Sequence, residues 1–130
     1  MGFYRTRERF ASEIPDEIIV GFVLSREYVS FVELQEFLDA AGYATRGEWA
    51  VTLGRFDRVV LWPAVSEALL RSLQRLIAAR RLFFHPACVT TYAIDGAVPS
   101  LPLASSIRVK TDSWLPAVLC SFPCRKAGAA

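Results

Sequence analysis

Arginine and glutamine side chains recur at helical spacing between residues 66 and 81. They are Arg71, Gln74, Arg75 and Arg81, and Arg46 lies in the segment before them. Guanidinium groups bind phosphates and can bond guanine at two atoms, and a glutamine amide can bond adenine in the same way. These five residues are therefore our candidates for contact with nucleic acid.

The same arginines have a simpler explanation. Arg71 and Arg75 fit the solvent-exposed face of an amphipathic helix whose other face is rich in leucine. Arg80 and Arg81, where this helix runs out, suit the negative end of its dipole. The spacing alone leaves both interpretations open.

Catalytic chemistry has weaker support in the sequence. His85, Cys88 and Asp95 are the residues that could act as base, nucleophile and orienting acid. No glycine-rich phosphate loop, GxSxG elbow or HExxH pair occurs. We therefore expect a protein that is not an enzyme.

A structural metal site would have to use nearly every suitable ligand in the chain. Three cysteines (Cys88, Cys120 and Cys124) and one histidine are present, so a closed tetrahedral zinc site would take all four. The odd number of cysteines also argues against a disulfide framework. We expect free thiols, no metal and no cofactor.

The composition is that of one globular domain with tails. The chain has 130 residues, of which 53% are apolar and 22% charged, and this excludes global disorder. The net charge of +2 is too small to indicate nucleic acid by itself. Its distribution is uneven, because residues 16–41 carry −5 and residues 61–94 carry +3. No apolar run fits a signal peptide or a membrane span, so we expect a cytoplasmic protein.

Two helices are predicted in the first third of the chain. The first covers residues 15–25 and begins at Pro15, which suits a first helical turn. A short extended link follows. The second helix covers residues 31–41, with Ser30 and Glu33 forming a capping box and Gly42 closing the helix in a left-handed conformation.

Residues 43–62 allow two structures. Thr45 to Glu48 fits a second capping box, which predicts a short helix. The strings WAVTL and RVVLW on either side of residues 54–57 instead predict a β-hairpin. We favour the hairpin because residues 59–62 are β-branched and aromatic.

The rest of the chain is predicted as a helix, two strands and an extension. The helix covers residues 66–80 with Ser66 as its N-cap, and strands at 82–85 and 89–94 end at an Asp-Gly turn. Prolines punctuate residues 97–122, which should be extended and pack on the domain. The apolar run 113–122 should add an edge strand or cover the core; otherwise it is an exposed partner surface.

The phrases SFVELQEFLDAAGY and SEALLRSLQRLIAARRLFF…TTYAI resemble the winged helix-turn-helix superfamily over residues 15–94. The resemblance implies an α+β, winged-helix-like fold with three helices, short β-hairpins and a proline-rich C-terminal extension. From the residues we expect the chain to divide into a basic arm (1–13), a domain (14–96), an extended apolar segment packed on the domain (97–122) and a disordered tail (123–130). The resemblance lies within the domain. It also implies a non-enzymatic, regulatory protein that binds duplex DNA as a homodimer, with 66–80 as the recognition helix.

The chain departs from this family in two places. About two dozen residues separate the two helices that a helix-turn-helix joins by a short turn. The wing tip expected at residues 85–88 carries no arginine or lysine. The alternative is therefore a protein-interaction or dimerisation module of the same fold without nucleic-acid binding, which uses the uncharged segments 97–106 and 114–122.

Overall fold

The computed structural model describes residues 13–124. The expected basic arm, apart from residue 13, and the last six residues of the expected tail lie outside the described residues. The elements in chain order are α2 (Asp16–Arg26), α3 (Phe31–Ala40), β1 (Arg46–Leu53), β2 (Phe56–Val65), α4 (Glu67–Ala78), β3 (Phe83–Pro86), α5 (Val89–Asp95), β4 (Ser113–Trp114) and β5 (Ala117–Cys120). The α+β class is thus confirmed, with four helices in this part of the chain where three were expected.

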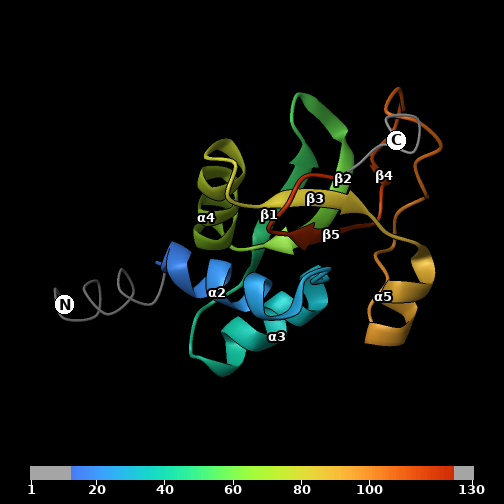
Figure 1. Ribbon diagram of the computed structural model, residues 1–130. Helices are drawn as coiled ribbons and strands as arrows, with labels where there is room; N and C mark the ends of the chain where they lie inside the picture. Colours follow the sequence, from blue (N-terminus) through green and yellow to red (C-terminus); the bar gives the residue numbers. More distant parts are fainter. Residues whose placement is uncertain (1–12, 125–130) are drawn as a thin grey trace, which may run out of the picture.

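The strands form two small sheets between the helices. In one sheet β1 and β2 are antiparallel and β4 joins β2 in parallel; in the other β3 pairs with β5. Figure 1 shows α2 and α3 on one side of the strands, α4 and α5 at opposite ends, and the β1–β2 hairpin projecting away from α2 and α3. The tip of the hairpin therefore lies on the side of the molecule away from α2 and α3.

The first two helices lie where the sequence placed them. In α3 the Ser30 hydroxyl accepts a hydrogen bond from the Glu33 N–H at 3.1 Å, and the Glu33 carboxylate accepts one from the Ser30 N–H at 3.2 Å. This confirms the predicted capping box. Gly42 has φ +93°, so it closes the helix in the left-handed region as predicted. Pro15 is the N-cap of α2, one residue before the predicted helical position.

The predicted hairpin is confirmed, and the alternative helix at residues 45–48 is wrong. Thr45 does not cap a helix; its hydroxyl donates to Asp39 at 2.6 Å. The buried Gln35 amide of α3 holds the hairpin at two points. It donates to the Thr45 carbonyl at 3.1 Å and accepts from the Trp62 indole N–H at 2.9 Å. Docking against Gln35 thus stabilises the strand that the local capping pattern opposed.

Helix α4 begins as predicted and ends two residues early. Ser66 caps it by accepting the Leu69 N–H at 3.2 Å. Leu69, Leu73 and Leu76 are buried in the core. The helix stops at Ala78, and Arg80 has φ 58°, which turns the chain toward β3.

The prediction of a strand at 89–94 is wrong, and with it the hairpin between 82–85 and 89–94. Residues Val89–Asp95 form α5, and β3 pairs with β5, about thirty residues further along the chain. Threonine, tyrosine and isoleucine favour strands only when a partner strand is present. Here the fully buried Tyr92 anchors a short helix instead. Gly96, with φ +89°, closes this helix, so the Asp-Gly signal marks a helix end.

The C-terminal extension contributes to both sheets. As predicted for residues 113–122, the run both adds strands and covers the core: β5 lies between β3 and the isolated bridge at Val29, and Trp114 is 1% exposed. The order across this second sheet is therefore Val29, β5, β3.

We expect Tyr92→Phe to destabilise the protein. The Tyr92 hydroxyl accepts from the Phe31 N–H at 3.1 Å and donates to the Ala117 carbonyl at 2.6 Å, so its loss leaves two buried backbone groups without this partner. The free energy of unfolding, measured by urea denaturation, should fall by about 2 kcal/mol. Leu24→Ala on α2 is the control, because Leu24 is 57% exposed. Equal stability of Tyr92→Phe and wild type would contradict this role of the hydroxyl.

Candidate nucleic-acid interface on helix α4

Helix α4 presents one exposed face opposite its leucines. Arg71, Gln74 and Arg75 are exposed on this face together with Glu67. The structure thus brings three of the five candidate residues together. Arg46 begins β1, and Arg81 follows the end of α4, so neither belongs to this face.

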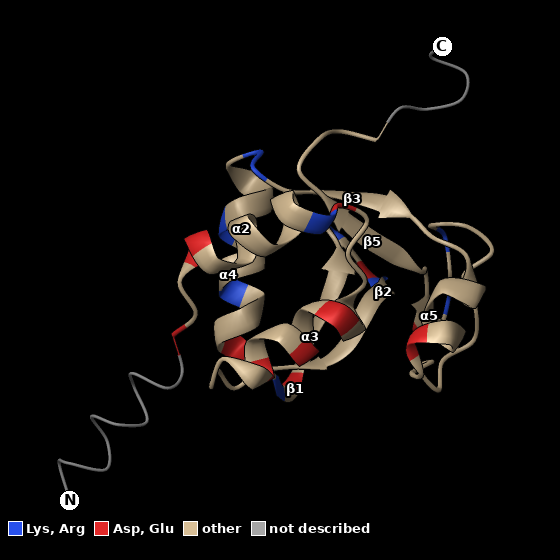
Figure 2. Ribbon diagram, turned by 60° about the horizontal axis from the view of Figure 1, so that its bottom comes forward, with Lys and Arg blue, Asp and Glu red and all other residues tan. Residues whose placement is uncertain are grey.

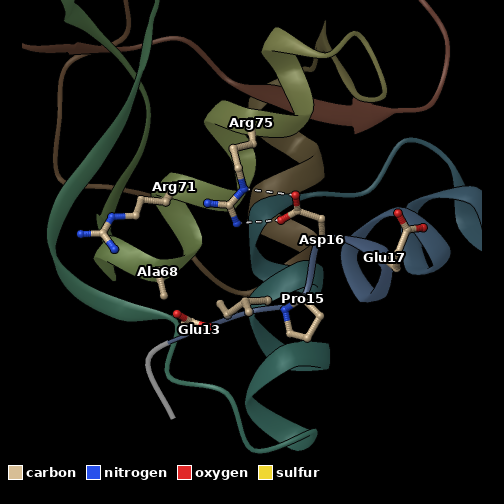
Figure 3. Close-up of a pocket in the computed structure, with 8 residues that line it drawn as sticks. Glu13, Pro15, Asp16, Glu17, Ala68, Arg71 and Arg75 are labelled. Carbon is tan, nitrogen blue, oxygen red and sulfur yellow. Dashed lines mark hydrogen bonds and ion pairs between the residues drawn. The ribbon is translucent and has the colours of Figure 1, made fainter. Parts of the chain in front are cut away.

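Arg75 is held by the first turn of α2. Its Nε and Nη2 donate to the two carboxylate oxygens of Asp16 at 3.2 and 2.8 Å (Figure 3). Nη2 also donates to the Ser72 hydroxyl at 3.0 Å. The Arg75 guanidinium lowers the pKa of the Asp16 carboxyl below its ordinary value, against the opposing effect of burial. Arg75 thus ties α4 to α2.

The other candidate arginines also have carboxylate partners. Arg81 bonds both oxygens of Glu17 at 2.6 and 3.0 Å, which lowers the pKa of Glu17. Arg71 donates to Glu67 one helical turn away at 2.5 Å, and Arg46 lies 3.4 Å from Asp39. All four predicted arginines are thus in ion pairs.

This surface as a whole is not basic. Figure 2 shows cationic and acidic residues side by side where α2 meets α4. Over residues 13–124 the chain carries ten cationic and twelve acidic side chains, a net charge of −2. A hollow of about 570 Å³ beside α4 likewise has walls of both signs, because three acids and two arginines line it, namely Glu13, Asp16, Glu17, Arg71 and Arg75. A uniformly positive face, the usual electrostatic footprint of nucleic-acid binding, is missing from α4.

The acidic partners were not among our predicted site residues. One sequence signal could have found them, namely the charge of −5 over residues 16–41 against +3 over residues 61–94. Opposite charges in two helices of one small domain favour pairing between those helices.

Gln74 borders a second, apolar hollow. This groove of about 250 Å³ lies between α4 and β1. No charged side chain lines it; its walls are Ala50, Val51, Thr52, Gly54, Leu70, Leu73, Gln74, Ile77, Ala78 and Phe84. Gln74 therefore stands between the arginine row and an apolar wall.

The residues considered for catalysis have separate partners. His85 Nε2 donates to the Phe122 carbonyl at 2.7 Å, and Asp95 accepts from the Ser30 hydroxyl at 2.5 Å. Cys88 is exposed, and hydrogen bonds from the Thr91 backbone and from Thr90 lower the pKa of its thiol. The hydrogen bonds of His85 and Asp95 thus connect segments of the fold and do not join the two side chains in a shared reaction centre.

Between residues 13 and 124 there is no cluster of three or more His, Cys, Asp or Glu side chains that could hold a metal ion. None of the helices in that range has the length and apolar character needed to cross a bilayer.

We expect Asp16→Asn to destabilise the protein at neutral pH but not in acid. Because the folded state lowers the pKa of Asp16, its contribution is complete above the ordinary carboxyl range and is lost as the pH falls through the folded-state value. Both partners are partly exposed, so the loss at neutral pH should be about 0.5 kcal/mol. Urea denaturation at pH 7 and near pH 2 measures the difference.

Glu36→Gln is the matched control for Asp16→Asn. Glu36 is exposed on α3 and makes no ion pair with another described residue. Its variant should match wild type at both pH values. An effect of Asp16→Asn that persists in acid would show that the ion pair is not its cause.

Comparison of the chain with protein-family models, with curated proteins and with solved structures gives no match. The geometry described above is therefore what supports any functional proposal.

Proposed function

We propose that this chain is a winged-helix-like protein that binds duplex DNA through α4. The arrangement that supports the proposal is α2, the short pairing at Val29, α3, α4 and then β3 with β5. In this proposal β3 and β5 form the wing. The hairpin β1–β2 is inserted between α3 and α4, and residues 87–116 are inserted within the wing.

This version of the fold differs from the one expected from sequence. There the wing was residues 82–94, with a tip at residues 85–88 that carried no cation. With β5 as the second wing strand, the connection between the strands becomes long and includes Arg108 and Lys110. The lack of basic residues at 85–88 therefore no longer argues against DNA binding.

The observation that carries the proposal is the shared exposed face of Arg71, Gln74 and Arg75. These side chains can bond phosphates or base edges. Their ion pairs do not prevent this, since the Arg71 and Glu67 side chains are 63% and 52% exposed. Exposed ion pairs are worth only about 0–1 kcal/mol, so a phosphate can replace the carboxylate at small cost.

The test is duplex binding measured by fluorescence anisotropy over a salt titration. We expect wild type to bind more tightly than millimolar at low salt and to weaken as salt rises, because phosphate contacts release counterions. Arg71→Ala combined with Gln74→Ala should weaken binding to the preferred sequence by about tenfold or more, at about 1 kcal/mol or more per lost base contact.

Arg26→Ala is the control for this test, since Arg26 is an exposed arginine on α2 and outside the α4 face. Affinity no better than millimolar at low salt would reject DNA binding. Tight binding that the double variant of Arg71 and Gln74 leaves unchanged would reject α4 as the helix that contacts the bases.

A second candidate function is dimerisation with another copy of this chain. Of the two segments expected to form a partner surface, most of 114–122 is excluded, because Trp114 and residues 117–120 are buried in the fold. The region around 97–106 still offers exposed apolar side chains, with Ile94, Val98 and Leu103 exposed by 79%, 51% and 56%. Such exposed residues are typical of a partner surface when they form one patch.

For the dimer we expect a doubled mass by light scattering at micromolar concentrations. Val98→Asp combined with Leu103→Asp should return the mass to that of one chain, because a buried unpaired carboxylate opposes association. Leu24→Asp is the control, an exposed leucine on α2. A wild-type protein that scatters as a single chain would reject this candidate.

A further inference from the structure

We infer that the end of the β1–β2 hairpin, with the segment 107–110, forms a second surface that binds the phosphate backbone of nucleic acid. We call it the hairpin-end surface and define it by Arg55, Phe56, Arg58, Arg108 and Lys110. The inference rests on the proposed function only in taking nucleic acid as the polyanion.

The surface joins two distant parts of the sequence at one hollow. The hollow measures about 260 Å³ and is lined by Arg55, Phe56, Asp57, Arg58, Ile107 and Val109. Arg108 and Lys110 are exposed and are the chain neighbours of Ile107 and Val109, so two more cations lie next to the residues that line the hollow. In Figure 1 the hairpin tip and the segment near residue 107 both project from the side of the molecule away from α2 and α3.

The cations here are less neutralised than those on α4. Four described cations make no ion pair with a described carboxylate, namely Arg55, Arg80, Arg108 and Lys110, and three of them belong to this surface. Arg58 lies 3.9 Å from Asp112, with side chains 61% and 65% exposed, which is the longest ion pair described. The surface therefore carries four cations against Asp57 and Asp112.

This charge balance is opposite to that of the rest of the described chain. Residues 13–124 have a net charge of −2, whereas the four cations and two acids of the hairpin end give +2. The rest of residues 13–124 is therefore net acidic, and within the described part of the chain a polyanion is attracted more strongly to this end than to the remainder.

An aromatic ring among the cations favours nucleic acid over other polyanions. The Arg55 guanidinium lies 5.7 Å from the centre of the partly exposed Phe56 ring. A base can stack on such a ring or on the guanidinium plane while arginines bond the adjoining phosphates. Contacts of this kind do not depend on base sequence. The hairpin end would hold the backbone, and α4 would contact the bases.

The test compares two double variants. One combines Arg55→Gln and Arg58→Gln, and the other, the charge-matched control, combines Arg26→Gln and Arg80→Gln. Binding to several duplex sequences, to single-stranded DNA and to RNA is measured by anisotropy over a salt titration. Removing two phosphate contacts should lower the slope of log affinity against log salt by about 1.8 for duplexes, and weaken all sequences by about tenfold at low salt. The control should keep the wild-type slope. Thermal melting establishes that both variants are folded.

The outcomes separate this inference from the proposed function. If the double variant of Arg55 and Arg58 binds duplex DNA as wild type does, the hairpin-end surface is overturned. DNA binding by α4 is not affected by that result. Binding of single strands or RNA, lost in this variant, without any duplex binding supports the surface and overturns the proposed function. Poly-glutamate that competes as well as nucleic acid overturns the assignment to phosphate. Wild type that binds none of these nucleic acids overturns both.

Discussion

The hydroxyl group of Tyr92 connects three parts of the chain that lie far apart in sequence. It accepts the Phe31 N–H at the start of α3 and donates to the Ala117 carbonyl at the start of β5. Its ring packs against the rings of Trp62 and Trp114, with distances between ring centres of 4.9 and 5.2 Å. Burial raises the pKa of Tyr92 far above its ordinary value, so the hydroxyl keeps the proton that it donates. Tyr92 therefore joins α3 to the second sheet through its buried hydroxyl and contacts the first sheet through its ring.

Charge is used in this molecule first to hold helices together. Asp16 and Glu17 in the first turn of α2 bind Arg75 and Arg81, on α4 and just beyond it. These carboxylates also suit the positive end of the α2 dipole. These arginines thus bind carboxylates of the protein itself. A polyanion at α4 must compete with those carboxylates. At the hairpin end three cations have no such competitor among the described residues.

Two connecting segments supply candidate surfaces in addition to the α4 face. The hairpin between α3 and α4 borders the groove beside Gln74 and carries Arg55 and Arg58 at its end. The residues between β3 and β5 supply Arg108 and Lys110 and also the exposed Val98 and Leu103. These candidate surfaces therefore lie on connecting segments, where binding residues are common on a rigid scaffold.

The sequence by itself determined the elements whose signals are local. The capping box at Ser30, the N-cap at Ser66 and the left-handed Gly42 depend on neighbours within four residues, and each was predicted. Tertiary structure decided the rest. Residues 89–94 have strand propensity but became helix α5, because β5 and not this segment pairs with β3 and Tyr92 is buried. Likewise the sequence predicted Arg75 on an exposed helix face and Arg81 at the end of that helix. Only the packing of α2 against α4 placed carboxylates within 3 Å of both. A sequence pattern shows which groups are available, but contacts between distant segments determine which of them remain free.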